Sequence, residues 1–252
     1  MFHREINVLD WRLRELADVV DDFVVVEATR THSGLPREVL RPCGYPRFKS
    51  LAGRLHGAVL DNAASDDDPW LRERGQREAI WPLGVAPLQP GDDDLVIISD
   101  VDEVPFPEVV DRLATSTFEP PLYVRPHWFN FDWDRYLGPW DHASIVFYTA
   151  GQLRRIYSEG HGADVGIAGV PGRELDGLNG WHASWFGSDR QVLDKLASYA
   201  HANDARDAAL RVRGAEAVRE RRLAGGDLFG TRAKRRKRPR LPRFAQLALP
   251  DG

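Results

Sequence analysis

The sequence has little cysteine and lacks any long uncharged apolar run. Its single cysteine in 252 residues, Cys43, excludes an internal disulfide framework and gives no sign of an oxidising compartment. No apolar stretch approaches the roughly 18 to 20 residues that span a bilayer. The first twenty residues mix charged and apolar positions, whereas a signal peptide has a basic flank followed by an apolar block. We therefore expect a cytoplasmic protein.

The composition is that of a folded chain, because 42% of the residues are hydrophobic and 10% are aromatic. No internal repeat or long low-complexity linker divides it, which predicts a single domain over residues 1–230 and a basic tail over residues 231–252. The tail lacks the interleaved aromatic residues that favour nucleic-acid binding. We expect no nucleic-acid partner. A solvated tail is the first interpretation of this segment, and a peripheral contact with an anionic membrane is the alternative. Its basic residues are Lys234, Arg235, Arg236, Lys237, Arg238, Arg240 and Arg243.

Apolar spacing predicts helices that alternate with strands along the chain. The predicted helices cover residues 7–20, 68–80, 108–114 and 189–201, and the last of them begins at a capping box formed by Ser188 and Gln191. The predicted strands cover residues 23–28, 56–61, 95–99, 121–126 and 144–149. This alternation predicts an α/β fold in three layers with a mixed, mostly parallel sheet.

The stretch LVIISDVDEVP, residues 95–105, places three carboxylates directly after an apolar strand. They are Asp100, Asp102 and Glu103. Like charges this close repel one another and raise one another's pKa unless a positive charge lies among them. Ligands of α/β sheets bind at the carboxyl ends of strands, and hard divalent cations take carboxylate oxygens. The turn therefore predicts a site for Mn²⁺ or Mg²⁺.

Two enzyme classes use such a turn. In a nucleotide-sugar transferase, the Asp-x-Asp metal meets the pyrophosphate of the donor. In a phosphatase of the haloacid dehalogenase type, DVDEV would supply Asp100 as nucleophile and Asp102 as general acid. The phosphatase needs a later lysine followed by another paired-aspartate turn, and no such turn follows Lys195. The context favours the transferase. A non-catalytic nucleotide-sugar-binding protein is a third hypothesis.

Six segments in this order resemble glycosyltransferase family 17. They are EINVLDWRLREL, VVDDFVVVEATRTHSG, WLRERGQREAI, ISDVDEVP, NGWHASWFG and KLASYAH, and they extend over most of residues 5–201. The resemblance implies a GT-A type, Rossmann-like nucleotide-sugar-binding fold and a divalent metal. It also implies inverting transfer from a UDP-sugar to a glycan or glycolipid acceptor, with N-acetylglucosamine as the sugar of the family's characterised donor.

The resemblance also assigns roles to individual residues. Asp100 and Asp102 match the metal-binding Asp-x-Asp positions, with Asp100 also near the donor. Late histidines often complete the metal shell of such enzymes, which makes His182 the first candidate and His201 the second. The residues implied at the nucleotide are Glu27, Thr31, His32 and Arg77, the last as a phosphate ligand.

Inverting transfer needs a base that takes the proton of the acceptor hydroxyl. Among the carboxylates near the metal turn, we place Glu103 and Asp176 first. The others, whose spacing does not single them out, are Asp132, Asp134, Asp141 and Glu174. Glu5 and Arg12 lie one helical face apart, and we expect them to pair with each other.

Overall fold

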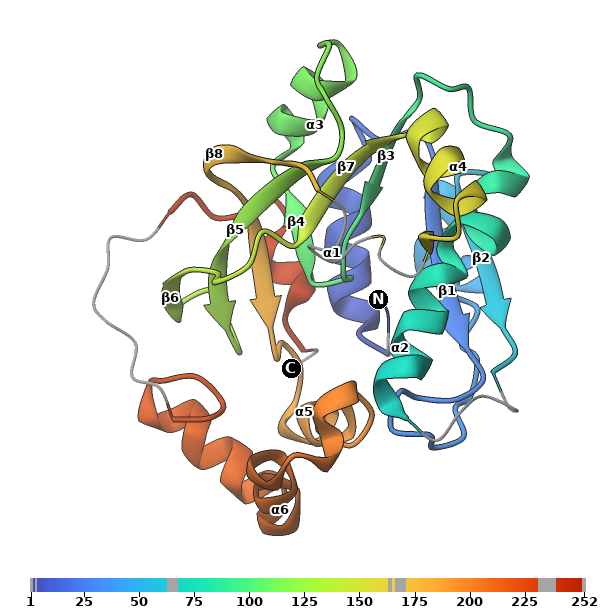
Figure 1. Cartoon of the computed structure of the whole chain (residues 1–252). Coiled ribbons are helices and arrows are strands. Elements are labelled where there is room, and N and C mark those ends of the chain that lie inside the picture. The colour runs from blue at the N-terminus through green and yellow to red at the C-terminus, as the bar shows by residue number, and fades with distance from the viewer. Residues whose placement is uncertain are drawn as a thin grey trace.

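Two β-sheets and the helices around them make up the computed structural model, which describes residues 2, 4–62, 68–162, 165, 171–230 and 239–250 (Figure 1). β1 (Phe23–Ala28) and β2 (Leu55–Leu60) form a two-stranded parallel sheet. The larger sheet has the strand order β3-β7-β5-β8-β4, and β6 pairs with β5. Its strands are β3 (Leu95–Ile98), β4 (Glu103–Pro105), β5 (Leu122–Asn130), β6 (Tyr136–Pro139), β7 (Ile145–Thr149) and β8 (Arg173–Ser184).

The larger sheet is mixed, and the prediction of a mostly parallel sheet is wrong. Only β5 and β8 run parallel there, whereas the pairs β3–β7, β5–β7, β5–β6 and β4–β8 are antiparallel. The reason lies in the connections. β5, β6 and β7 follow one another through residues 131–135 and 140–144. Connections this short join antiparallel strands, because parallel neighbours need a crossover of about a dozen residues or more.

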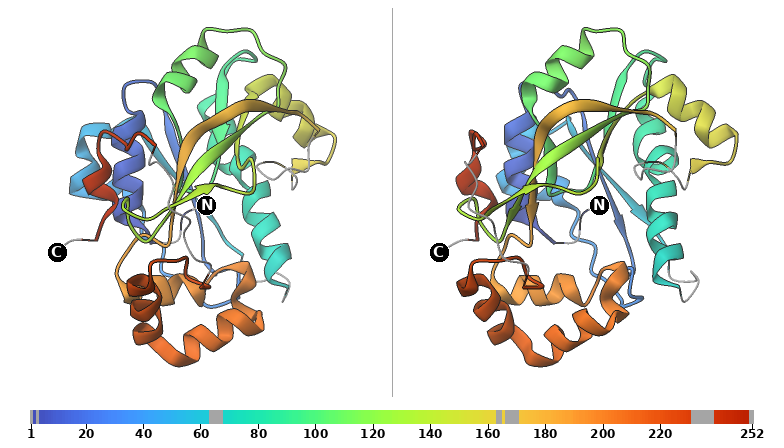
Figure 2. Two further views of the ribbon diagram at one scale, coloured as in Figure 1. Left: turned by 90° about the vertical axis from the view of Figure 1, so that its left-hand side faces the viewer. Right: turned by 60° about the vertical axis from the view of Figure 1, so that its left-hand side comes forward.

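Six α-helices are present within the described residues. They lie around the two sheets (Figure 2). The capping box that opens α5 is confirmed, and Pro69 lies in the first turn of α2 as expected. α6 is broken at Gly214, whose φ of 75° suits glycine. The helices are α1 (Ile6–Leu16), α2 (Pro69–Glu78), α3 (Pro107–Ala114), α4 (Ala150–Ser158), α5 (Asp189–Leu196) and α6 (Ala205–Ala224). The elements that the sequence analysis missed are β4, β6, β8, α4 and α6.

Short helical turns connect these elements. Their bounds are η1 (Pro42–Gly44), η2 (Pro46–Leu51), the π-helical η3 (Ile80–Val85), η4 (Ala86–Leu88), η6 (Ala200–Asn203) and η7 (Ala245–Ala248). Within the described part of the chain, no helix is both long and apolar enough to cross a membrane.

The end of the predicted tail packs against α1, where η7 lies beside the helix (Figure 2). The carboxylate of Glu15 accepts hydrogen bonds from the backbone N–H groups of Arg243 and Phe244, both at 3.0 Å. The Trp133 indole donates to the carbonyl of Ala245 at 2.6 Å. Residues 239–250 are therefore anchored to the domain. The basic residues of 231–238 lie outside the described residues.

Candidate functional site

The acidic turn lies between two strands of the larger sheet. β3 ends at Ile98 and β4 begins at Glu103, whose N–H donates to the carbonyl of Asp100 at 3.0 Å. β4 pairs with β8, so that Glu103 lies opposite His182. A side chain at Gly180 would place its Cβ 2.7 Å from the carbonyl oxygen of Val104. The glycine in the GWH segment therefore permits the close pairing that brings His182 to the turn.

Arg12 holds the backbone of this turn from α1. Its Nη1 donates to the carbonyl oxygens of Asp100 at 2.9 Å and Glu103 at 2.8 Å, and to Ser99 Oγ at 3.0 Å. Burial lowers the pKa of Arg12 to about 10, although the neighbouring carboxylates oppose this effect. The side chain stays charged at neutral pH. The predicted pair of Glu5 with Arg12 is wrong, because Arg12 is engaged by the turn.

Lys195 supplies a cation to Asp102 from α5. Its Nζ lies 2.9 Å from Asp102 Oδ2 and 2.8 Å from Glu5 Oε1. Burial disfavours the ammonium charge, but the two carboxylates outweigh it and raise the pKa of Lys195 above its ordinary value. Asp102 is therefore already neutralised by a positive charge of the protein itself.

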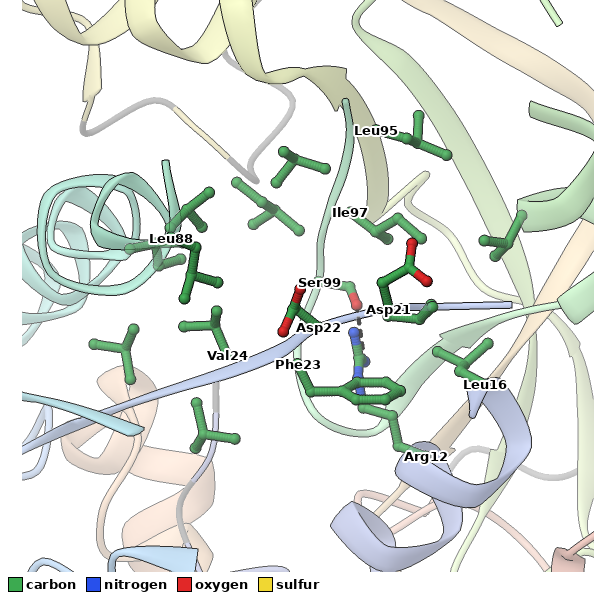
Figure 3. Close-up of a pocket in the computed structure, with 18 of the residues that line it drawn as sticks. Arg12, Leu16, Asp21, Asp22, Phe23, Val24, Leu88, Leu95, Ile97 and Ser99 are labelled. Atoms are coloured by element: carbon green, nitrogen blue, oxygen red, sulfur yellow. Dashed lines mark hydrogen bonds between the residues drawn. The ribbon is translucent and has the colours of Figure 1, made fainter. Parts of the chain in front are cut away.

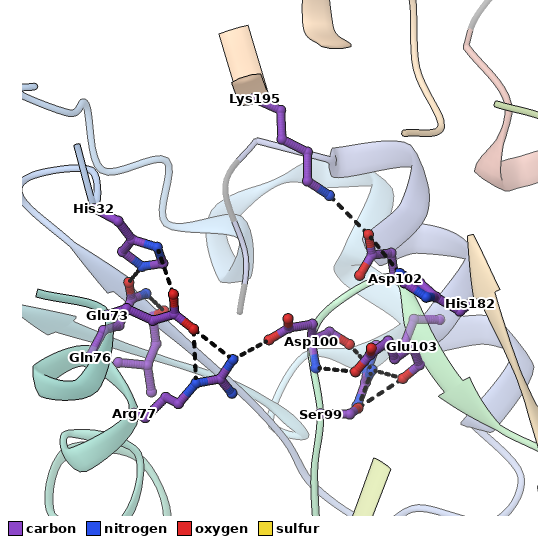
Figure 4. A network of polar contacts seen from close by, with 12 residues as sticks. His32, Glu73, Gln76, Arg77, Ser99, Asp100, Asp102, Glu103, His182 and Lys195 are labelled. Atoms are coloured by element: carbon purple, nitrogen blue, oxygen red, sulfur yellow. Dashed lines mark hydrogen bonds and ion pairs between the residues drawn. The ribbon is translucent and has the colours of Figure 1, made fainter. Parts of the chain in front are cut away.

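A second group of side chains joins the turn from α2, on the other side of Asp100 (Figure 4). Arg77 Nη2 lies 3.5 Å from Asp100 Oδ1 and 3.1 Å from Glu73 Oε1. His32 shares a hydrogen bond of 3.0 Å with Gln76 Oε1, and its Nδ1 lies 3.9 Å from Glu73. Burial lowers the pKa of His32 in spite of the neighbouring Glu73. A continuous polar network thus joins His32 and Arg77 to Asp100.

The two histidine candidates have different surroundings. His182 Nε2 lies 3.9 Å from Asp102 Oδ2 and 2.9 Å from Ser184 Oγ, and its ring meets Trp140 edge-on. His182 Nδ1 is buried, with no hydrogen-bond partner among the described residues. His201 instead pairs with Asp204. The structure brings only His182 to the acidic turn.

The two predicted bases also differ in position. Glu103 is 5% exposed, and burial raises its pKa, with Asp100 and Asp102 adding to the effect and His182 opposing it. Asp176 is exposed on β8, six residues before His182. That separation is roughly 20 Å in an extended strand. Only Glu103 therefore belongs to the group around the turn.

Glu27 and Thr31 support the segment that follows β1. The carboxylate of Glu27 accepts from the backbone N–H groups of Leu40 at 2.9 Å and Arg41 at 2.8 Å. The Thr31 hydroxyl accepts from Leu35 N–H at 3.0 Å. The side chains of Glu27 and Thr31 thus bind the backbone of the segment that follows β1. His32 and Arg77 instead belong to the polar network that reaches Asp100.

The donor set limits how a metal could bind. Among the described residues, no three His, Cys, Asp or Glu side chains are grouped so that they could hold an ion by themselves. The side chain of Asp100 is 36% exposed, however, and Asp102 lies two residues away. Magnesium commonly takes one or two carboxylates and completes its shell with water and substrate phosphates. The turn therefore fits a divalent ion that is held jointly by these carboxylates and by the phosphates of a bound substrate.

The neutralising role of the cations at this turn was not predicted from the sequence, although Arg77 was placed in the site as a phosphate ligand. The three adjacent carboxylates were expected to need positive charge, and that need was assigned to a metal. The structure shows that Lys195, Arg12 and Arg77 supply part of it. One signal was present, since Lys195 is the only lysine between position 50 and the basic tail.

Comparison with known proteins gives a family and several relatives for this chain. The profile of glycosyltransferase family 17 matches residues 1–232. The chain is similar to the β-1,4-mannosyl-glycoprotein 4-β-N-acetylglucosaminyltransferases of Homo sapiens and Rattus norvegicus, with 25% and 30% identity over 224 residues. Each match covers 78% of this chain and 41% of the relative, so the chain spans less than half the length of these relatives. No solved structure matches it.

Proposed function

The chain belongs to glycosyltransferase family 17, and from this premise we propose that it transfers N-acetylglucosamine from a UDP-sugar to a hydroxyl group of a glycan or glycolipid. The observation that carries the proposal is the convergence of Asp100 and Asp102 with Arg77 and Lys195 just beyond the carboxyl end of β3. The family assignment favours this transferase over the phosphatase. The names of the human and rat relatives support the choice of sugar.

The donor diphosphate would lie against the exposed side of the acidic turn. There Asp100 and Asp102 would hold Mn²⁺ or Mg²⁺, which neutralises the charge that develops on the leaving nucleotide. Arg77 is placed to donate charge-assisted hydrogen bonds to phosphate oxygens, because its guanidinium already reaches Asp100. A nucleotide-sugar fold of the GT-A type is part of this proposal, and the strand that ends in the acidic turn supports it.

Glu103 is the base in this proposal. In an inverting transfer, the acceptor oxygen forms a bond to the anomeric carbon while the bond to the diphosphate breaks, and the hydroxyl proton passes to the base. A carboxylate whose pKa is raised by burial is a stronger base than an ordinary carboxylate, which suits that role. Glu103 is supported over Asp176 by its place in the turn.

A thermal unfolding scan tests the donor site directly. With Mn²⁺ present, we expect UDP and UDP-N-acetylglucosamine to raise the apparent stability by about 2.7 kcal/mol at a hundredfold excess over Kd. GDP-mannose and the metal-free samples are the controls and should give no comparable shift. Absence of any shift, together with phosphate release from aryl phosphates, would favour the phosphatase. A shift without sugar transfer would identify a non-catalytic binding protein.

Replacing Lys195 by methionine tests whether a metal can neutralise Asp102. The change leaves Asp102 and Glu5 without their shared cation, and we expect the free energy of unfolding to fall by about 3 kcal/mol. Added Mn²⁺ should restore part of that loss, because the ion supplies the missing charge. Lys49→Met, at an exposed position, is the matched control. If Mn²⁺ stabilises Lys195→Met no more than Lys49→Met, the ion does not replace the charge of Lys195 beside Asp102.

A further inference from the structure

Trp128 and Trp140 are half-buried tryptophans that belong to none of the hydrophobic cores of the described chain. Trp133, from the same stretch of sequence, is a core residue that packs against Trp11. The ring of Trp140 instead meets the rings of Trp128 and His182 almost edge-on, with centroids 4.9 and 4.4 Å apart. The two indoles therefore lie beside the site and outside the cores.

Trp128 and His182 lie on the same face of the larger sheet as Glu103. His182 of β8 is paired with Glu103 of β4 on one side and with Trp128 of β5 on the other. Side chains of directly paired residues lie on the same face of a sheet. The Trp128 indole donates to Ser184 Oγ at 3.0 Å, and this oxygen shares a hydrogen bond of 2.9 Å with His182 Nε2. The opposite face carries the core residue Trp181.

Buried polar atoms on this face lack hydrogen-bond partners within the described part of the chain. Asn130 lies opposite Ser184 in the sheet and is 0% exposed, and neither its Oδ1 nor its Nδ2 has a partner. The Nδ1 atom of His182 has none either. Buried polar groups are nearly always hydrogen-bonded, so that such exceptions mark places where a ligand supplies the partner. A ligand rich in hydroxyl groups can both donate and accept there.

No arginine or lysine among the described residues lies over the indole of Trp128 or Trp140. Other tryptophans of the chain are covered in this way, because Arg240 lies over Trp181. A ligand at the two indoles would therefore meet aromatic carbon, imidazole and amide groups without a fixed positive charge. This chemistry suits a neutral sugar ring, which presents C–H groups on its faces and hydroxyl groups around its edge.

The two tryptophans lie away from the proposed position of the donor phosphates. Arg77 and His182 are on opposite sides of the acidic turn (Figure 4). A cavity of about 530 Å³ between β1 and β3 lies on the Arg77 side, and its lining includes Arg77 but neither Trp128 nor Trp140 (Figure 3). An acceptor held at the tryptophans would reach Glu103 from the side opposite the leaving diphosphate. Inverting transfer requires that direction of attack.

We propose that Trp128, Trp140 and His182 form the subsite for the sugar ring of an uncharged glycan acceptor, the ring whose hydroxyl attacks the donor. This inference rests on the transferase function proposed above and names the class of its acceptor. The Trp140 indole packs against the C–H face of the sugar. Asn130 and His182 Nδ1 hydrogen-bond to its other hydroxyl groups, and Glu103 takes the proton of the attacking hydroxyl.

Replacing Trp140 tests the subsite. Trp140→Leu keeps an apolar side chain and removes the ring, whereas Trp140→Phe keeps a ring. Trp70→Leu, at a tryptophan of α2 that is 47% exposed, is the matched control. Three neutral trisaccharides, mannotriose, chitotriose and maltotriose, are titrated into the full chain with UDP and Mn²⁺ present. NMR signals of the indole N–H groups give the dissociation constants, and thermal shifts give UDP binding.

We expect at least one trisaccharide to bind to the unchanged protein and to Trp140→Phe, and its dissociation constant to rise about tenfold or more in Trp140→Leu. Trp70→Leu should bind it as the unchanged protein does, and the shift with UDP should be the same in all variants. In the unchanged protein, which needs no substitution to be read, the indole signals of Trp128 and Trp140 should move and that of Trp133 should not.

The outcomes separate this subsite from the transferase proposal. Failure of all three trisaccharides to bind, or equal affinities for Trp140→Leu and Trp70→Leu, would overturn the subsite even if UDP binds. Movement of the Trp133 signal without those of Trp128 and Trp140 would overturn it as well. Loss of sugar binding in Trp140→Leu alone, with no response of any variant to UDP, would support the subsite and reject the donor site.

Discussion

We expect Asp102→Asn to remove metal-dependent nucleotide binding and to lower sugar transfer by more than about 100-fold. The carboxylate charge is what a hard cation requires, and asparagine keeps the shape of the side chain without that charge. Even groups that only orient metal ligands change affinity or activity by about 10- to 100-fold when replaced. A direct ligand should cost more. Equilibrium binding of UDP with and without Mn²⁺ and single-turnover transfer assays measure both effects.

Asp176→Asn is the matched control for this result. Asp176 is also a carboxylate on a strand of the larger sheet, but it is exposed and lies far from the turn along β8. It should keep nucleotide binding and transfer near the level of the unchanged protein. If Asp102→Asn still binds UDP in a metal-dependent way, the metal assignment is wrong. If Asp176→Asn loses transfer but keeps binding, Asp176 is the base in place of Glu103.

Arg12→Met should be the most destabilising single change at the site. It removes one buried cation together with its hydrogen bonds to the carbonyl oxygens of Asp100 and Glu103 and to the hydroxyl of Ser99. Breaking such a buried charged contact costs about 3 to 5 kcal/mol, and hydrogen bonds to charged groups contribute about 1.5 to 3 kcal/mol each. We expect a fall of the thermal midpoint by roughly 10 °C. Chemical and thermal denaturation measure it.

Arg14→Met provides the comparison on the same helix. Arg14 pairs with Asp10, but its side chain is 43% exposed, and exposed ion pairs contribute about 1 kcal/mol or less. Equal losses for the two variants would show that Arg12 does not hold the turn. A second readout separates structure from chemistry. Arg12→Met should weaken Mn²⁺ binding even at low temperature, where the variant is folded, because the turn that carries Asp100 and Asp102 is no longer fixed.

Local features of the site were predicted from the sequence because neighbouring residues decide them. The apolar run 95–98, the acidic turn and the helix that follows Pro107 all appear as β3, the turn and α3. The capping box at Ser188 was equally local. His182 and Arg77 were selected by family resemblance, and both lie beside the acidic turn.

Contacts between distant segments were not predictable in the same way. Lys195 meets Asp102 across 93 residues and Arg12 meets Glu103 across 91, and no periodicity or motif reports such a distance. The sheet order depends on which strands are adjacent after folding, and here β8 returns to lie between β5 and β4. The cavity between β1 and β3 likewise exists only because two strands far apart in sequence face each other.

The sequence by itself determined the carboxylate-bearing turn, the strand β3 before it, the helix α3 after it, and the family to which the chain belongs. The turn and its flanking elements follow from the order of residue types, because hydrogen bonding and apolar burial between near neighbours decide them. The family follows from the order of the matching segments. The tertiary structure alone decided which cations neutralise the turn, that Glu103 and not Asp176 lies beside it, and that β1 and β3 face a cavity. Those features depend on packing between segments, and packing is settled only when the whole core has formed.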